Sequence, residues 1–168
     1  MYGCGPYDSM EKILKSMVTT RQSHEAIKED AQSCPLYFMN WQNIDLQKEF
    51  RIFVYNNEIT AISTQNLFLP SVRYAINTWL KDLQVTEIEQ IVYTILHYFD
   101  VHIRNNMSYM KHYVMDLALT QPDNKPYFIE ANTFGKDYAA GSSLFQWAID
   151  HDQLHDNTSI EFRFVERD

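Results

Sequence analysis

Apolar residues recur at helical spacing in several segments of the chain. We expect helices over residues 10–17, 71–83 and 86–107, and shorter helices within 23–31 and 142–150. In the longest of these segments the apolar residues lie three or four positions apart, which places them on one face of a helix. The Asp-Ser pair that precedes the first segment is typical of a helix N-terminus.

Other segments are rich in the aromatic and β-branched residues that strands favour. These segments are residues 36–41, 49–55, 58–63 and 160–166, and the two halves of residues 112–135. Two of them are joined by Asn56-Asn57, which indicates a tight turn because asparagine tolerates a positive φ. The order of the elements predicts an α+β fold in which helices pack on one face of an antiparallel sheet.

The predicted hairpin at residues 112–135 has acidic residues where apolar ones are expected. If residues 121–125 form its loop, Asp116 lies directly opposite Glu130, and Asn132 shares the strand face of Glu130. Like charges directly across a strand pair are unfavourable by up to ~1 kcal/mol. Either this face is simply exposed to water, or a cation lies between the acids. The oxygen donors suit Mg²⁺, with water and phosphate completing its coordination.

The composition fits a single domain over residues 1–168. Apolar residues make up 45% of the chain, which is enough for a core and excludes a disordered chain. The formal net charge of −8 argues against a surface that binds nucleic acid.

Cysteine usage and hydropathy indicate the compartment. Cys4 and Cys34 are too few and too far apart for a disulfide framework or a structural zinc site. No apolar stretch approaches the roughly 20 residues needed to span a membrane, and the N-terminus lacks the pattern of a signal peptide. We therefore expect a cytoplasmic protein with no membrane partner.

Two further groups of polar residues are candidates for chemistry. His97 and His102 are five positions apart, so on an α-helix they would not share a face, and we expect them and His112 to be surface residues rather than metal ligands. Lys136 and Asp137 follow the hairpin and either serve a second substrate or form a solvated loop.

Four segments, in this order, resemble the ATP-grasp proteins of the cell-division-cycle 123 type. They are CPLYFMNWQNIDLQKEFRIFV, YNNEITAIS, YVMDLALTQPDNKPYFIEANTFG and NTFGKDYAAGSSLFQW. In that family the first contains a hinge strand and a Glu-Phe-Arg-x-Phe-Val strand, and the third is a metal-binding hairpin. The resemblance extends over about residues 1 to 155 and implies the C-terminal lobe of an ATP-grasp fold.

The resemblance implies a role for each matching residue. Asp116, Glu130 and Asn132 would hold one or two Mg²⁺ ions on the β- and γ-phosphates of ATP. Arg51 would be the catalytic residue that reaches the terminal phosphate or an acyl phosphate, for which a guanidinium is well suited. Without the resemblance, Arg51 is equally well explained as a strand residue that pairs with Glu49 or with solvent.

The resemblance also implies a nucleotide-binding hinge. Phe38, Met39, Asn40 and Trp41 would contact adenine through backbone groups, although Trp41 is equally well explained as a core residue. Glu49 would contact the ribose or orient Arg51.

The sequence departs from the family pattern in two places. The opening residues YGCGPYDS resemble the segment that follows the family's phosphate-binding lysine, so that lysine would fall before Met1. The N-terminal lobe is then absent because the chain is a fragment, because a second chain supplies the lobe, or because the protein is a reduced relative. Met39 and Asn40 also replace a basic pair in the hinge.

The resemblance therefore implies a protein that binds ATP and Mg²⁺. If it is an enzyme, it would be a carboxylate–amine ligase that works through an acyl phosphate, with a small-molecule or protein substrate. The alternatives are an assembly chaperone or binding module for translation initiation factor 2, as in the cell-division-cycle 123 type, or a non-catalytic remnant that acts as an interaction domain.

Overall fold

The computed structural model describes residues 6–19, 39–67, 78–137, 141–156 and 158–165, with residues 78–83 described by their backbone alone. The chain divides into two compact units, Met1–Asn43 and Ile44–Asp168, which are described separately here. That residues 1–168 form a single domain stays a prediction. None of the described helices is both long enough and apolar enough to cross a lipid bilayer.

The first unit contains the helix α1, Met10–Thr19, which confirms the helix predicted from residue 10. The side chain of Ser9 accepts a hydrogen bond from the backbone N–H of Lys12 at 3.4 Å, as expected of a residue that caps a helix. The predicted helix within residues 23–31 lies outside the described residues.

The strand predicted over residues 36–41 is wrong for its described part. Residues 39–41 have irregular backbone, and the side chains of Met39 and Trp41 are exposed. Aromatic content favours a strand only where the side chains have a surface to pack against, and these side chains have none among the described residues.

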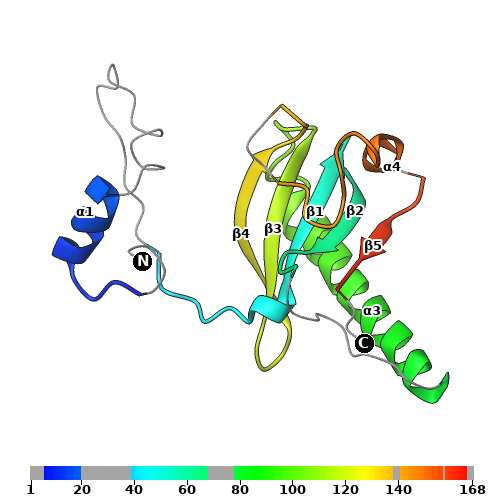
Figure 1. Ribbon diagram of the computed structural model, residues 1–168, viewed down its shortest axis with the longest axis horizontal. Helices are drawn as coiled ribbons and strands as arrows, with labels where there is room; N and C mark the ends of the chain where they lie inside the picture. The colour runs from blue at the N-terminus through cyan, green and yellow to red at the C-terminus, as the bar shows by residue number, and fades with distance from the viewer. Residues whose placement is uncertain (1–5, 20–38, 68–77, 138–140, 157, 166–168) are drawn as a thin grey trace. The chain divides into compact units, whose positions relative to one another are not determined.

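The second unit is built on a five-stranded sheet whose strands follow the order β4-β3-β1-β2-β5 (Figure 1). The strands are β1 (Glu49–Tyr55), β2 (Glu58–Thr64), β3 (Tyr113–Thr120), β4 (Lys125–Thr133) and β5 (Glu161–Arg163). All neighbouring pairs are antiparallel except β2 and β5, which are parallel. The predicted α+β class with a mainly antiparallel sheet is confirmed.

The turn between β1 and β2 follows the sequence prediction. Asn56 and Asn57 have φ angles of 51° and 63°, in the left-handed region that asparagine tolerates. Arg104 holds the start of β2, because its guanidinium donates hydrogen bonds to the carbonyl of Asn57 and to both carboxylate oxygens of Glu58. The same guanidinium lies 4.9 Å from the ring centre of Phe99.

One long helix includes the described part of the helix predicted over residues 71–83 and most of the one predicted over 86–107, while residues 71–77 lie outside the described residues. The helix α3 runs from Thr78 to Tyr98 without a break and continues into a π-helical segment, η2 (Phe99–Ile103). The backbone N–H of Arg104 bonds the carbonyl of Phe99 at 2.8 Å, which is the i to i+5 spacing of a π-helix. The sequence suggested that one helix ends near residue 83 and another begins at residue 86. The polar residues around position 84 instead form part of a continuous helix.

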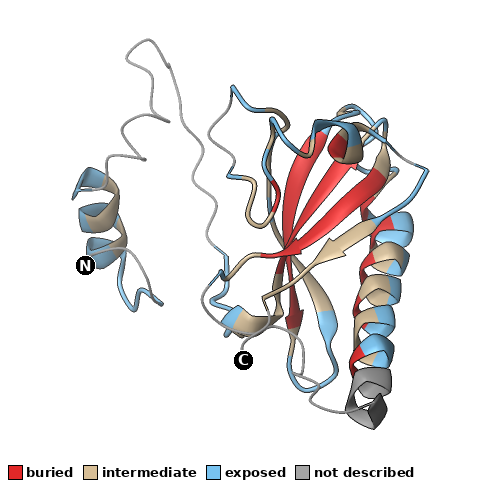
Figure 2. Cartoon of the chain, turned by 45° about the vertical axis from the view of Figure 1, so that its right-hand side comes forward, coloured by how far each residue is buried: buried red, intermediate tan, exposed pale blue. Residues whose placement is uncertain are grey.

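The helix α3 covers one face of the sheet, as Figure 2 shows by the contrast between its buried and exposed sides. Ile91, Ile95 and Phe99 of the helix and its π segment pack against apolar strand residues such as Ile52 and Met115. The sheet face that α3 covers therefore contains the larger part of the core.

The opposite face of the sheet is covered by residues 141–150, which we call the 141–150 segment, and by the short helix α4, His151–His155. Phe145 and Leu154 pack there on Phe53. The helix predicted within residues 142–150 is wrong, because these residues form turns and α4 begins only at residue 151. Ser63 of β2 accepts a hydrogen bond from the backbone N–H of Leu144, and Gln65, just after β2, accepts one from the Ser143 hydroxyl. These bonds compete with the hydrogen bonds that a helix would need.

The hairpin of β3 and β4 brings its acids together through a β-bulge. The loop is Gln121–Asn124, one residue shorter than predicted, because Thr120 pairs directly with Lys125. Continued without interruption, that register would place Ile129 opposite Asp116. The register shifts beside Asp116, so that Asp116 pairs with Glu130 as predicted. A bulge of this kind redirects the side chains that follow it.

Candidate functional site

The centre of the candidate site is an ion pair between β1 and β3. Arg51 and Asp116 are directly paired across the two strands, and both side chains are buried, with Arg51 8% and Asp116 3% exposed. Arg51 Nε lies 2.9 Å from Asp116 Oδ1, and Nη2 lies 2.7 Å from Oδ2. This two-point contact is the strongest geometry for such a pair. The hydrogen bonds that Arg51 donates to Asp116 raise the pKa of Arg51, although the burial of Arg51 opposes that effect.

The guanidinium is also held from the 141–150 segment. Arg51 Nη1 donates to the carbonyl of Gly141 at 2.7 Å. A side chain at position 141 would place its Cβ 3.3 Å from Nη1, so glycine permits this close approach. Arg51 therefore pairs with neither Glu49 nor solvent, but links Asp116 to a carbonyl of the 141–150 segment.

Glu130 and Asn132 complete the group predicted from the hairpin. Glu130 lies opposite Asp116, and Asn132 Nδ2 donates to Glu130 Oε1 at 3.1 Å, so both side chains share one face as predicted. Glu130 is exposed and Asn132 is partly buried, while Asp116, on the neighbouring strand, is buried. The sequence residues Arg51, Asp116, Glu130 and Asn132 are therefore brought together.

Glu49 adds a third carboxylate to the same face. It is two residues before Arg51 on β1, and burial raises its pKa, with smaller contributions from the charges of Asp116 and Glu130 and an opposing one from Arg51. Three carboxylates surround one guanidinium, so the site carries an excess of negative charge. Such a site favours a cation.

The oxygen atoms of Asp116, Glu130 and Asn132 suit a Mg²⁺ ion that is already bound to a phosphate better than they suit a free Mg²⁺ ion. Within the described ranges no three His, Cys, Asp or Glu side chains converge closely enough to hold a metal. Each oxygen of Asp116 accepts one bond from Arg51 and has a further lone pair, and Glu130 is open to solvent. Mg²⁺ is commonly held by one or two carboxylates together with substrate phosphates and water. Asp116 and Glu130 would hold it, with the Asn132 amide oxygen as a third donor.

The predicted hinge lies in a different part of the chain. Phe38 is outside the described residues, and Met39, Asn40 and Trp41 belong to the first unit, whereas the acidic site belongs to the second. Their contact with adenine stays a prediction.

A cavity of about 540 Å³ opens beyond the end of β4, on the side of the sheet that α4 covers. Its lining includes Phe134, Lys136, Asp137, Trp147, His151 and His155. The rings of Phe134 and Trp147 meet edge to face with their centres 4.9 Å apart. The sequence left Lys136 and Asp137 open between a second substrate and a solvated loop. In the structure they border a cavity whose lining begins at Phe134, two residues after Asn132.

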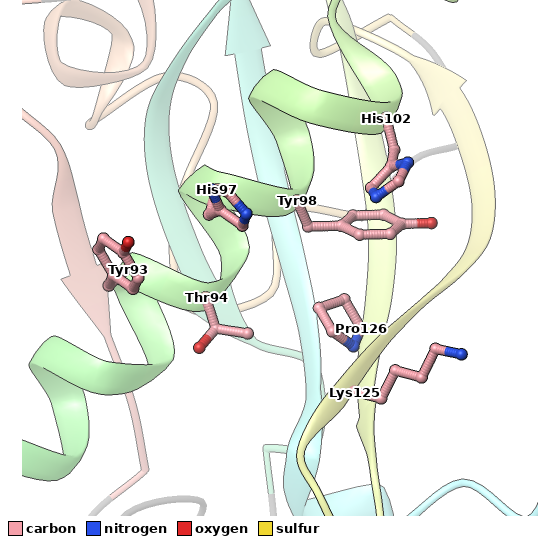
Figure 3. Close-up of a pocket in the computed structure, with 7 residues that line it drawn as sticks. All are labelled: Tyr93, Thr94, His97, Tyr98, His102, Lys125 and Pro126. Atoms are coloured by element: carbon pink, nitrogen blue, oxygen red, sulfur yellow. The ribbon is translucent and has the colours of Figure 1, made fainter.

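A second pocket lies between α3 and the start of β4. The sequence predicted that His97 and His102 lie on different faces of a helix, and this prediction is wrong. Both histidines line this pocket of about 280 Å³, with Tyr98 between them, Tyr93 beyond His97, and Pro126 on β4 (Figure 3). The π-helical segment after Tyr98 turns five residues through about one turn, and so brings both histidines to one side. Each histidine packs against a tyrosine, as expected of surface residues.

Sequence reasoning missed the 141–150 segment as part of the site. Beyond the Gly141 carbonyl, the hydroxyl of Ser63 accepts a bond from the N–H of Leu144 at 3.1 Å, and the Ser143 hydroxyl bonds Gln65 at 2.7 Å. Backbone contacts leave no signature in a sequence. Two signals were available. The segment NTFGKDYAAGSSLFQW resembles a family motif, and Ser63 lies at the end of the β2 pattern, where a buried serine needs a partner.

The segment is tied to β5 by a carboxylate whose pH dependence is testable. Hydrogen bonds from Arg163 lower the pKa of Asp150 below its ordinary value of 3.8. A carboxyl with a lowered folded pKa stabilises the fold above its unfolded pKa, and this contribution is lost as the pH falls through the folded pKa. We expect the melting temperature to fall less steeply in Asp150→Asn than in the parent between about pH 5 and pH 2.

Thermal melts at several pH values measure this difference, with Asp152→Asn as the matched control, because Asp152 is a neighbouring carboxylate on the surface. That control should follow the parent. An Asp150→Asn curve that also follows the parent contradicts the prediction.

The fold and the site together define an α+β protein with a polar, acid-rich sheet face braced by one arginine. The family model of D123 matches residues 7–168, and the chain belongs to the D123 family. No curated protein sequence matches it significantly.

Two solved structures are similar to this chain. Cdc123 from Schizosaccharomyces pombe is 17% identical, with a TM-score of 0.63, over 94% of this chain and 61% of that one. C-terminally truncated Cdc123 from the same organism is 16% identical, with a TM-score of 0.64, over 94% of this chain and 62% of that one. At these identities the likeness shows the fold, and the chain spans about three fifths of the length of these relatives.

Proposed function

We propose that this chain is a module of the ATP-grasp type that binds ATP together with Mg²⁺ and serves protein assembly. The observation that carries the proposal is the directly opposed pair Asp116 and Glu130, with Asn132 on the same face and an excess of negative charge around Arg51. Membership of the D123 family supports the assembly role.

The opposed acids favour a bound cation because Arg51 neutralises only one of them. Its contacts are to Asp116, while Glu130 has its hydrogen bond from Asn132, a neutral amide. A divalent ion bridging Asp116, Glu130 and a phosphate would remove the repulsion that remains. The exposure of Glu130 leaves room for the phosphate and for water.

The geometry changes the role proposed for Arg51. Three of its five N–H groups already bond Asp116 and Gly141, so the side chain is fixed and cannot swing toward a distant phosphate. We propose that Arg51 holds the metal-binding carboxylate in place, and that its two remaining N–H groups are available to a phosphate that approaches the metal.

A carboxylate–amine ligase is the second candidate. The cavity that Lys136 and Asp137 border favours it, because that cavity opens just after β4, the strand that carries Glu130 and Asn132, and offers a place for an acceptor. The binding module remains the first proposal, since binding needs only the residues that the structure brings together, whereas ligation needs a second substrate.

The experiment is calorimetric titration with ATP, with and without Mg²⁺, of the parent chain and of Glu130→Ala. We expect binding that depends on Mg²⁺, no measurable binding of Mg²⁺ alone, and affinity at least about tenfold weaker in Glu130→Ala, as for the loss of a charged contact. The control is Glu89→Ala, which removes an exposed acid from α3 on the opposite face of the sheet. It should bind as the parent does.

Three outcomes separate the candidates. Mg²⁺-dependent binding without release of ADP supports the binding module. Release of ADP that requires an added amine and a carboxylic acid supports the ligase. An absence of ATP binding in the parent chain contradicts both.

A further inference from the structure

Arg51 is held from two sides, so the site depends on where the 141–150 segment lies. Asp116 fixes two of the guanidinium nitrogens, and the carbonyl of Gly141 fixes the third. Asp116 is part of the sheet and cannot move independently. Gly141 lies on a segment without regular structure, whose position must come from other contacts.

Arg163 supplies several of those contacts. Its Nη1 donates to the carbonyl of Leu144 at 3.1 Å and to Asp150 Oδ2 at 2.9 Å, and its Nη2 donates to Asp150 Oδ1 at 2.7 Å. The guanidinium also lies 4.0 Å from the ring centre of Phe145, close enough for a cation–π contact. One side chain therefore contacts three residues of the segment at once.

Arg163 is itself placed by the sheet. It lies on β5, in parallel register with Ser63 of β2, and Ser63 bonds the N–H of Leu144. Arg163 Nε bonds Glu161 of the same strand at 2.6 Å. The end of the chain is thus connected, through the 141–150 segment, to the guanidinium beside Asp116.

We propose that Arg163 is a positioning residue for the Arg51–Asp116 pair, and that β5 is required for a well-formed site. Arg163 touches neither Arg51 nor Asp116 and acts through the carbonyl of Gly141. Its effect on ligand binding rests on the proposed function, whereas its effect on the geometry of Arg51 does not.

Arg104 provides a matched control. Its side chain is 29% exposed and that of Arg163 is 31% exposed, and each bonds both oxygens of one carboxylate, a backbone carbonyl and a phenylalanine ring face. Arg104, however, holds the turn of β1 and β2 and the end of η2, not the 141–150 segment. Replacing either arginine by alanine removes similar contacts, and only one replacement loosens the segment.

The experiment follows the Arg51 Nε–H group by ¹⁵N NMR in the parent, Arg163→Ala, Arg163→Lys and Arg104→Ala, without any ligand. Hydrogen exchange of this group reports local opening of the Arg51–Asp116 pair. We expect exchange about tenfold faster in Arg163→Ala, since the loss of one bond to a charged group changes an equilibrium by that much. The exchange rate in Arg163→Lys should lie between those of the parent and Arg163→Ala, because lysine retains the charge but not the planar guanidinium.

The same variants are then titrated with ATP and Mg²⁺. We expect affinity about tenfold weaker in Arg163→Ala and unchanged in Arg104→Ala. Unchanged Arg51 exchange in Arg163→Ala overturns the inference, as does equal acceleration in Arg104→Ala, which would mean general loosening. If the parent binds no ATP, the proposed function fails, and the exchange comparison alone decides the role of Arg163.

Discussion

Asp116→Ala should lower the free energy of unfolding by about 3–5 kcal/mol, the loss seen when one partner of a buried ion pair is removed. The reason is that Arg51 would stay buried without a carboxylate to accept its hydrogen bonds, because the hydrogen bond that remains is to the carbonyl of Gly141. Urea denaturation followed by tryptophan fluorescence measures the change.

Two further variants separate this effect from ligand binding. Glu130→Ala removes an exposed acid from the same face and should change the unfolding free energy by no more than about 0.5 kcal/mol. The double variant Asp116→Leu with Arg51→Met removes both charges and should recover much of the loss. A cost below about 1 kcal/mol in Asp116→Ala would contradict a buried, mutually dependent pair. Loss of ATP binding in Asp116→Ala alone would not identify a metal ligand, so Glu130 is the better probe.

Phe145→Ala has the second large expected effect, a loss of about 3–5 kcal/mol of unfolding free energy. The side chain is 1% exposed and packs edge to face on Phe53 with ring centres 5.3 Å apart, with Arg163 on its other side. Truncation leaves a cavity beneath the 141–150 segment and removes the ring under the guanidinium. Thermal and urea denaturation both report the loss.

The control for this variant lies in the same segment. Ile149 is 76% exposed, so Ile149→Ala should change the unfolding free energy by no more than about 0.5 kcal/mol. Equal losses in the two variants would mean that the segment does not pack on the sheet through Phe145.

The sequence was most informative where the side chains themselves determine the structure. Asn56-Asn57 predicted the turn of β1 and β2, and the period of two along a strand predicted that Glu130 and Asn132 share one face. The candidate residues of one hairpin could be assembled because a strand pair has one regular period. Their roles toward ATP and Mg²⁺ stay predictions.

The sequence was least informative where backbone groups or irregular turns decide. The residue opposite Asp116 was predicted correctly from a loop one residue too long, and the bulge at Ile129 compensates for the difference. The π-helical segment that brings His97 and His102 together has no local signal in its residues. The contact of Arg51 with a carbonyl likewise depends on the tertiary fold alone.

The bulge in β4 also bears on solubility. In the described part of the chain β4 has a strand partner on one side only, and a free strand of nine residues is a template for pairing between molecules. The irregular register at Ile129 interrupts its row of hydrogen-bonding groups, while Pro126 lacks an N–H and Lys125 adds charge. We therefore expect the distortion that brings Glu130 opposite Asp116 also to disfavour pairing of this edge with a neighbouring molecule.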